Sequence, residues 1–587
     1  MDMDSKGTPH MELIRGIAAA YEERRDLMVV ALTGRTGSGC TTAALQLSKP
    51  FDEISLTYED SPEPEKRKLA ISQDFAKSQW VPFKCISVSA AIYSFLLEEP
   101  WENIDRLIRT QKINEQAISN LQHLHKTMQN HRDYASFYDA MNFSDDEDIK
   151  TSAWNFFNIE ISQQLNEVRK EFGNFFQPFF QTIGDNVRLS GKATDNSPDA
   201  SKLFDLMIRL RKLVHAAESH NKSNKITSTR VVIDAIRNPL ELVYLRDHFG
   251  SFYAVAITTD DEARRARLAD NGLSKADITR LDDKEYSSTT KHLDDYKSFV
   301  SQNLMDCIQK ADIFIHNPGK PGEIGLLGKY LNAQLVRYVA LALRPGLVTP
   351  TRDERCMQIA FVAKLNSGCI SRQVGAAVAD KNYSIKSVGW NDVAKGQVPC
   401  LLRNVDDLIK GDDSNAFSDY EKKSQDLKNH LSKTFKQRET LKTSQGLRCP
   451  YCFKDAYNSI TKKSNQVHTR SLHAEENAFL QLAKYGSNGI EHGILYTTAS
   501  PCELCSKKAY QLGIKEIVFV DPYPGISSTH VLAYGTADDR PKLRLFSGAV
   551  GHAYHRLYDP LLSIKDEYTA RLSQETQIQL PLTSPKA

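Results

Sequence analysis

Histidine, glutamate and two cysteines stand in this chain at spacings that suit a metal-dependent hydrolytic site. His473 and Glu475 are two residues apart, and Cys502 and Cys505 are three apart, directly after Ser500-Pro501. One imidazole and two thiolates leave the fourth position of a zinc ion open for water, which marks a catalytic rather than a structural site. The glutamate is not needed as a ligand and is available to move protons.

The flanking residues predict elements that bring these side chains together. Residues 493–498 have the pattern of a buried strand, and residues 502–512 and 474–484 have that of helices. Both cysteines then lie on one helix face, and two helix N-termini point at the metal, which favours thiolate over thiol. A Cys-x-x-Cys pair alone is often a structural zinc knuckle or a redox pair, but the ordered set is typical of zinc deaminases of nucleobases and nucleotides.

Composition and length set the limits of the interpretation. A chain of 587 residues is too long for one core and predicts two main domains. It has no apolar run long enough to span a bilayer and no secretory signal, and its ten cysteines are too sparse for a disulfide scaffold. We therefore expect a cytoplasmic protein without membrane contact. A net charge of +2 gives no general footprint for nucleic acid.

A second pattern near the N-terminus suits phosphate binding. Residues 27–33 form an apolar strand-like run, a glycine-rich loop follows, and a helical segment begins after it, which is the order of a P-loop. The spacing matches the Walker A pattern except that Cys40 stands where the phosphate-binding lysine belongs. We predict that ATP or another nucleotide binds here with Mg²⁺; the alternative is a merely flexible turn. The predicted nucleotide-binding residues are Gly34, Arg35, Thr36, Gly37, Ser38, Gly39, Cys40, Thr41, Thr42 and, at the end of a later strand, Asp234.

The predicted fold class is α/β throughout, in two domains. Residues 1–345 are expected to form a parallel-sheet domain that resembles the nucleotide kinases, with a helical insertion at about 50–225. A basic helix start at Arg264, Arg265 and Arg267 resembles the lid of such kinases or is a solvated face. Residues 346–587 are expected to form an α/β/α zinc domain, in which the charged helical stretch 404–445 lacks an apolar face wide enough for a core.

The C-terminal motifs, taken in order, carry a family resemblance. They are Cys369-x-Ser371-Arg372-x-x-Gly375, Gly389-Trp390-Asn391, His-Ala-Glu from His473, and Ser-Pro-Cys-x-x-Cys from Ser500. This order resembles the deoxycytidylate deaminases, and its combination with a P-loop domain that lacks lysine resembles the bacterial anti-phage dCTP deaminases.

The resemblance implies a function and roles for several residues. It implies conversion of dCTP, and in some members dCMP, to the uracil form, which starves phage replication. His473, Cys502 and Cys505 would bind zinc, and Glu475 would shuttle protons. Residues 371–379 and 384–390 are expected to form a hairpin, and Asn391 would hold the deoxyribose unless it only caps that hairpin. We also expect a homo-oligomer, and a small inhibitory RNA is a partner that the resemblance adds.

Further site residues are predicted with alternatives left open. The backbone groups of Ala474 and Ser500 are expected to read the cytosine edge. Phosphate charge would be met by cations from Arg372, Lys386, His555 and Arg556. Cys369, Cys400, Cys449 and Cys452 either hold a second, structural zinc or are buried free thiols.

Two competing functions remain at this stage. A polynucleotide deaminase would flip a base out of DNA or RNA, but it calls for a basic aromatic groove that the near-neutral charge disfavours. A nucleotide kinase or NTP-driven switch would use the zinc domain only structurally, and Cys40 disfavours phosphoryl transfer because the lysine charge is missing.

Overall fold

The computed structural model describes residues 16–570, except residues 18, 20, 22–25, 57–62, 111–112, 287–295, 319–323, 464–467, 487–488 and 521–529. The chain divides into two compact units: unit 1 comprises residues up to Thr349 and from His552 onward, and unit 2 comprises Pro350–Gly551. The expected boundary at 345/346 lies close to the observed division. The return of the chain to unit 1 after unit 2 was not expected from the sequence. No helix within the described ranges combines the length and the apolar character that crossing a bilayer requires.

Unit 1 is built on a parallel sheet whose strands follow the order β2-β3-β1-β4-β5. The central strands are buried along nearly their whole length, because helices cover both faces of such a sheet. Strand β2 lies inside the stretch that was expected to be a helical insertion, so that prediction was wrong at this point. The strands are β1 (Leu27–Thr33), β2 (Lys84–Ser87), β3 (Thr229–Asp234), β4 (Phe252–Thr258) and β5 (Ile313–His316).

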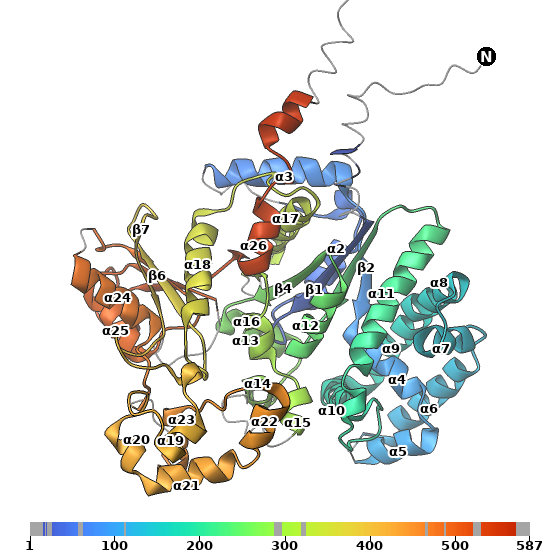
Figure 1. The fold of residues 1–587 in the computed structure, drawn as a ribbon. Helices are drawn as coiled ribbons and strands as arrows, with labels where there is room; N and C mark the ends of the chain where they lie inside the picture. Colours follow the sequence, from blue (N-terminus) through green and yellow to red (C-terminus); the bar gives the residue numbers. More distant parts are fainter. Residues whose placement is uncertain are drawn as a thin grey trace, which may run out of the picture. The chain divides into compact units, whose positions relative to one another are not determined.

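Helices fill the rest of unit 1, and those between β2 and β3 form a bundle beside the sheet (Figure 1). Aromatic side chains of this bundle pack against one another, as in the stacked rings of Phe176 and Phe180. The helices are α2 (Cys40–Leu47), α3 (Glu65–Gln79), α4 (Val88–Leu97), α5 (Trp101–Arg109), α6 (Glu115–Gln129), α7 (Tyr134–Asn142), α8 (Glu147–Asn155), α9 (Ser162–Phe172), α10 (Phe176–Ser190), α11 (Asp205–Ser223), α12 (Pro239–His248), α13 (Asp261–Asp270), α14 (Lys275–Tyr286), α15 (Tyr296–Val300), α16 (Leu304–Gln309), α17 (Ile324–Leu343) and α26 (Gly551–Tyr558).

Unit 2 contains a mixed sheet in the order β10-β9-β8-β6-β7. Strands β6 and β7 form the expected antiparallel hairpin, β6 also pairs antiparallel with β8, and β8, β9 and β10 are parallel. The elements are α18 (Arg352–Ala363), β6 (Gly375–Ala379), β7 (Ile385–Trp390), α19 (Val405–Lys410), α20 (Asp419–Lys423), α21 (Gln425–Thr434), α22 (Arg438–Gln445), α23 (Phe453–Thr461), α24 (Ala474–Tyr485), β8 (Ile494–Thr497), α25 (Glu503–Gln511), β9 (Glu516–Phe519), β10 (Lys542–Leu545) and β11 (Gly548–Ala549).

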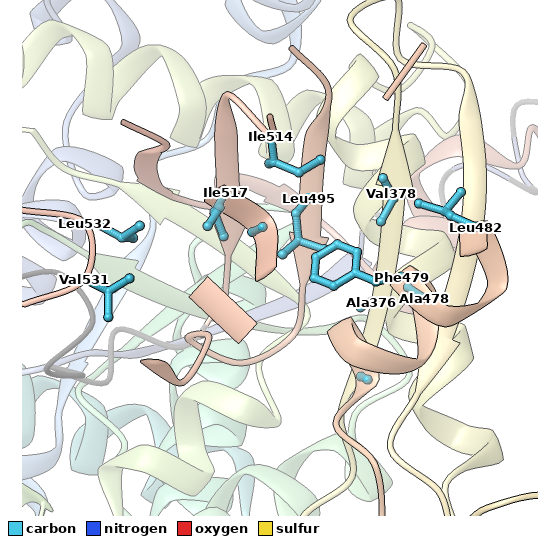
Figure 2. Close-up of a cluster of buried hydrophobic side chains, with 12 residues drawn as sticks. Ala376, Val378, Ala478, Phe479, Leu482, Leu495, Ile514, Ile517, Val531 and Leu532 are labelled. Carbon is cyan, nitrogen blue, oxygen red and sulfur yellow. The ribbon is translucent and has the colours of Figure 1, made fainter. Parts of the chain in front are cut away.

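An apolar core joins the sheet of unit 2 to the helices that carry the zinc motif (Figure 2). Phe479 and Leu482 of α24 and Ala509 of α25 pack with Val378 and Leu495 of the central strands. Small residues at the contact, such as Ala376, Ala474 and Ala478, let the helix backbone approach closely. The core therefore fixes the first turns of α24 and α25 relative to the sheet.

The charged stretch after β7 builds a small core of its own, contrary to the expectation for residues 404–445. Its apolar residues are spread over α19, α21 and the segment that leads into α23, so no single helix shows a wide apolar face. Together they bury Val405, Leu408, Ala416, Phe417, Leu427, Leu431, Cys449, Tyr451, Phe453 and Ala456.

Gly389 of β7 is required by the close approach of α24. A Cβ at this position would lie 2.3 Å from the Ala474 carbonyl oxygen and 2.4 Å from the Ala478 nitrogen. Both are backbone atoms, so the helix would have to move. The glycine of the Gly-Trp-Asn motif thus sets the position of the helix that begins beside His473.

We predict that Gly389→Ala lowers the free energy of unfolding of unit 2 by about 1–3 kcal/mol, the usual effect of overpacking. Zinc retention should fall as well, because α24 carries His473 at its start. Thermal unfolding and zinc content check this, with Gly250→Ala as control, because no heavy atom lies within 4 Å of a Cβ there. Equal stability and zinc content in the two variants would contradict the prediction.

Candidate zinc site and glycine loop

The imidazole and the two thiols meet at one point of unit 2. His473 Nδ1 lies 3.3 Å from Cys502 Sγ and 3.5 Å from Cys505 Sγ, and the three atoms are all within 4.8 Å of one another. Tetrahedral zinc with ordinary bond lengths separates a nitrogen and a sulfur ligand by about 3.6 Å. The three side chains therefore fit a zinc ion, with Nδ1 as the histidine ligand.

Helix starts position these ligands. His473 is the N-cap of α24 and Cys502 is the N-cap of α25, where its sulfur accepts a hydrogen bond from the Cys505 backbone N–H. Both helix N-termini, with their partial positive charge, face the cluster as the sequence indicated. A side-chain hydrogen bond between the two sulfurs lowers the pKa of the Cys502 thiol to about 3 and raises the pKa of the Cys505 thiol.

Glu475 lies in the first turn of α24 and is almost fully buried, with 4% of its surface exposed. One of its oxygens accepts a hydrogen bond of 3.1 Å from Thr497 Oγ1. Burial raises the pKa of the Glu475 carboxyl, so the group takes up a proton more readily than a solvated glutamate. It is therefore suited to accept and return protons beside the three ligands.

Thr497 is a site residue that the sequence reasoning missed. It ends strand β8 and is fully buried. Its hydroxyl orients Glu475, and the neighbouring Thr498 hydroxyl accepts a hydrogen bond from the Gly375 N–H of β6. Two threonines at the end of a strand that precedes Pro-Cys-x-x-Cys were the available signal.

Asn391 follows β7 and uses its side chain on the local backbone. Its Oδ1 accepts from the Val374 N–H and its Nδ2 donates to the Arg372 carbonyl, both at 2.7 Å. Its own carbonyl accepts from Ser367 Oγ. These bonds make it a loop-capping residue, the alternative left open above, and its contact with deoxyribose stays a prediction.

The two residues expected to read the base stand beside the ligands. Ala474 is fully buried at the start of α24, and Ser500 is partly buried just before Pro501. Among the expected phosphate ligands, Lys386 forms an ion pair with Asp380, while Arg556, in unit 1, donates to the Phe252 and Gly250 carbonyls. These two cations are engaged elsewhere.

The four cysteines expected to hold a second zinc do not form a group of this kind in the part of the chain that the structure describes. Within the described residues, His473, Cys502 and Cys505 make the one group of three or more nearby ligand atoms that is found. Arg403 donates to Cys400 Sγ at 2.9 Å, and Cys449 lies in the small apolar core. The second zinc at Cys369, Cys400, Cys449 and Cys452 gains no support from these contacts and stays a prediction.

The glycine loop of unit 1 joins β1 to α2, as the sequence indicated. Gly37 and Gly39 have φ of +88° and +106°, and a Cβ at Gly39 would lie 2.4 Å from Asn317 Nδ2, so a side chain is excluded there. Burial raises the pKa of Asp234, and Thr41 lies near enough to lower that pKa against the dominant effect of burial. A hydroxyl and a carboxylate so placed suit Mg²⁺ at the end of a phosphate-binding loop.

Cys40 begins α2 and is buried. Burial raises the pKa of its thiol to about 12, with Asp234 adding to the effect, so the side chain is neutral near pH 7. The position of the usual lysine therefore supplies no positive charge.

Arginines of α13 hold this loop rather than face solvent. Arg264 is fully buried and donates to the Thr36 carbonyl at 3.2 Å, and Arg267 donates to the Gly37 and Ser38 carbonyls at 3.4 Å. Arg265 is about half exposed and pairs with Asp261 and Asp282. The solvated-face interpretation is thus wrong for Arg264.

Unit 2 has the three-ligand centre and buried glutamate of a zinc-binding deaminase domain, and comparison with known proteins identifies the family. Residues 350–521 match the model of the cytidine and deoxycytidylate deaminase zinc-binding region. The chain is 30% identical to the deoxycytidylate deaminase of Enterobacteria phage T2 over 172 residues, which are 28% of this chain and 78% of that enzyme. The chain therefore belongs to the cytidine and deoxycytidylate deaminase family.

Other relatives match a similar share of the chain. The deoxycytidylate deaminase of Schizosaccharomyces pombe is 28% identical over 184 residues, which cover 31% of this chain but only 40% of that protein. The apo crystal structure of the dCMP deaminase from the cyanophage S-TIM5 aligns with 34% of this chain and 100% of its own at 21% identity, with a TM-score of 0.19.

We expect Cys502→Ala and His473→Ala to lose bound zinc, because each removes one of three protein ligands and leaves an incomplete site. Metal analysis of the purified variants checks this, with Cys85→Ala as the control because Cys85 lies in β2 of unit 1. A full complement of zinc in either ligand variant would show that the metal binds elsewhere.

Proposed function

We propose that the protein is a zinc-dependent hydrolase that deaminates the cytosine of free deoxynucleotides, dCTP first and dCMP second. The observation that carries this proposal is the buried Glu475, hydrogen-bonded to Thr497 and two residues from a ligand of the three-atom centre. The relatives named deoxycytidylate deaminases support a nucleotide substrate. The near-neutral charge of the chain supports a free nucleotide over a polynucleotide.

Glu475 performs the proton transfers of the reaction. Zinc, when bound, supplies a Lewis acid that lowers the pKa of water towards ~7. Glu475 accepts a proton from the water that attacks C4 of cytosine and delivers it to the ring N3. It then moves the second proton to the departing amine, which leaves as ammonia while the C4 oxygen becomes the carbonyl of uracil. The hydrogen bond from Thr497 holds the Glu475 carboxylate in the orientation that these transfers require.

Glu475→Gln should lower deamination by at least about 10²–10⁴-fold, since an amide cannot carry these protons. Zinc content should stay that of the wild type, because Glu475 is not one of the three gathered ligands. Uracil formation and metal content are measured on the same preparations, with Glu476→Gln, at a partly exposed position one residue along, as the control. Turnover at the wild-type rate in zinc-loaded Glu475→Gln would end this mechanism.

The substrate class is tested by competition among cytosine compounds. Purified protein is given dCTP, dCMP, CTP and single-stranded DNA at equal cytosine concentration, and uracil is followed. dCTP should react fastest. Faster deamination of the DNA would replace the proposed function with that of a polynucleotide deaminase.

The proposed role of unit 1 is to regulate this activity through nucleotide binding at the glycine loop. Three features support it: the loop conformation, the Thr41–Asp234 pair, and a neutral Cys40 that disfavours rapid phosphoryl transfer. A regulator must bind the active and inactive states with different affinity. In cells, the same coupling would deplete dCTP during phage infection, which is the anti-phage role implied by the resemblance.

Thr41→Ala should therefore change the response of deamination to added ATP while leaving zinc content unaltered. Deamination with and without ATP and Mg²⁺ is compared with that of Leu45→Ala, at an exposed position of α2 outside the predicted nucleotide-binding residues. Phage plating and cellular dCTP are measured for the same pair. If ATP binding is lost and neither deamination nor protection changes, unit 1 is not the regulator.

A further inference from the structure

A carboxylate from elsewhere in unit 1 is bound by the glycine loop. Glu285 of α14 accepts hydrogen bonds from both the backbone N–H and the hydroxyl of Thr36, at 3.1 Å and 2.6 Å. The two residues are 249 positions apart in the chain. Backbone N–H groups of such loops are the groups that bind phosphate oxygens, and a carboxylate oxygen carries the same kind of charge.

Cations surround this carboxylate. Arg237 bridges it to the loop: one guanidinium nitrogen donates to Glu285 Oε1 and the other to Thr36 Oγ1, each at 3.1 Å. Arg35 Nε lies 4.0 Å from Glu285 Oε2. The Glu285 side chain is only 3% exposed, so these contacts form where water screens them little.

The rest of the network already has its own acids. Arg35 pairs with Asp261 and Asp282, and Arg264 pairs with the same two carboxylates. Glu285 is the acid that contacts both the loop N–H and Arg237. If Glu285 moved away, the N–H and hydroxyl of Thr36 and the guanidinium of Arg237 could bind another anion.

Arg237 places a positive charge near Cys40, where the usual lysine is missing. The neutral thiol supplies no charge for a phosphate, but the guanidinium of Arg237 lies near enough to Cys40 to lower its pKa against the dominant effect of burial. The Arg237 side chain is about one quarter exposed, so a ligand in solution can reach it.

We propose that Glu285 occupies the position of a nucleotide phosphate in this loop, and that a nucleoside polyphosphate binds by displacing it, with Arg237 taking the role of the missing lysine. This inference rests on the proposed nucleotide site and assigns its phosphate ligands. Binding then exchanges one anion for another: α14 releases the loop as the polyphosphate enters. The affinity for nucleotide is set by that exchange rather than by the loop alone.

The experiment compares Glu285→Gln with wild type in binding of Mg²⁺-ATP by calorimetry, on the full-length protein. Removal of a charged competitor worth about 1.4 kcal/mol corresponds to tenfold tighter binding. Inorganic tripolyphosphate should also bind more tightly to Glu285→Gln than to wild type. Adenosine should bind the two proteins equally, because it has no phosphate to compete with Glu285. Asp283→Asn, at an exposed position of the same helix, is the matched control and should leave affinity unchanged.

Arg237 is tested in the variant that lacks the competitor. In Glu285→Gln, the further change Arg237→Gln should remove the gain in ATP affinity. Glu285→Asp, which keeps the charge on a shorter side chain, should fall between wild type and Glu285→Gln. Thermal unfolding establishes that each protein is folded, and the shorter acid provides a second measurement if the amide variant is unstable.

The outcomes separate this inference from the proposed function. ATP affinity that is equal or weaker in Glu285→Gln and Glu285→Asp overturns the inference, as does a gain that persists without Arg237. Deamination of dCTP by the wild-type protein is measured independently and decides the proposed function alone. Tighter ATP binding in Glu285→Gln with no deamination by wild type would support the inference and reject the proposed activity.

Discussion

The backbone contact between helix α24 and strand β7 determines where the chemistry of this protein takes place. At Gly389 the helix backbone lies closer than any side chain would permit. The contact brings the first turn of α24, with His473 and Glu475, over the sheet whose strand β8 provides Thr497. The apolar core beneath then holds α25 and its two cysteines against the same turn. The three segments that form the zinc site are therefore positioned relative to this one contact.

The predictable and unpredictable parts of the site differ in their range along the chain. His473 and Glu475, or Cys502 and Cys505, lie within one helical turn, so their spacing alone shows that they can act together. Thr497 and Gly389 act across strands, and the local motifs around them do not show which residues they contact. Glu285 reaches Thr36 across most of unit 1, a pairing that depends wholly on how α14 folds back. For Asn391, the sequence left open a contact with deoxyribose or a capping role, and the structure shows its amide engaged with backbone groups.

The fold follows the same rule. The hairpin, strand β8 and helices α24 and α25 were predictable because each has a continuous pattern of its own. Strand β2 was missed because four residues inside a largely helical, polar stretch carry too little pattern. The small core of residues 405–456 was missed because its apolar residues are shared among several short helices, each of which looks polar by itself. A pattern read within single segments cannot detect a core that several segments build jointly.

The C-terminal segment has a consequence for how the protein is made. Arg337 donates to Tyr558, the Gly346 N–H donates to the Leu557 carbonyl, and Glu567 accepts from both Arg344 and Tyr21, so the chain returns to unit 1 after completing unit 2. A chain is synthesised at about 5–20 residues per second, and its domains generally fold as units, the N-terminal one first. Of the two units, unit 1 begins to be translated before unit 2 but is completed after it, because residues from His552 onward are translated only after the whole of unit 2. While unit 2 is being translated, the surface of unit 1 that contacts residues 557–567 stays uncovered. The order of translation therefore limits when unit 1 can finish folding.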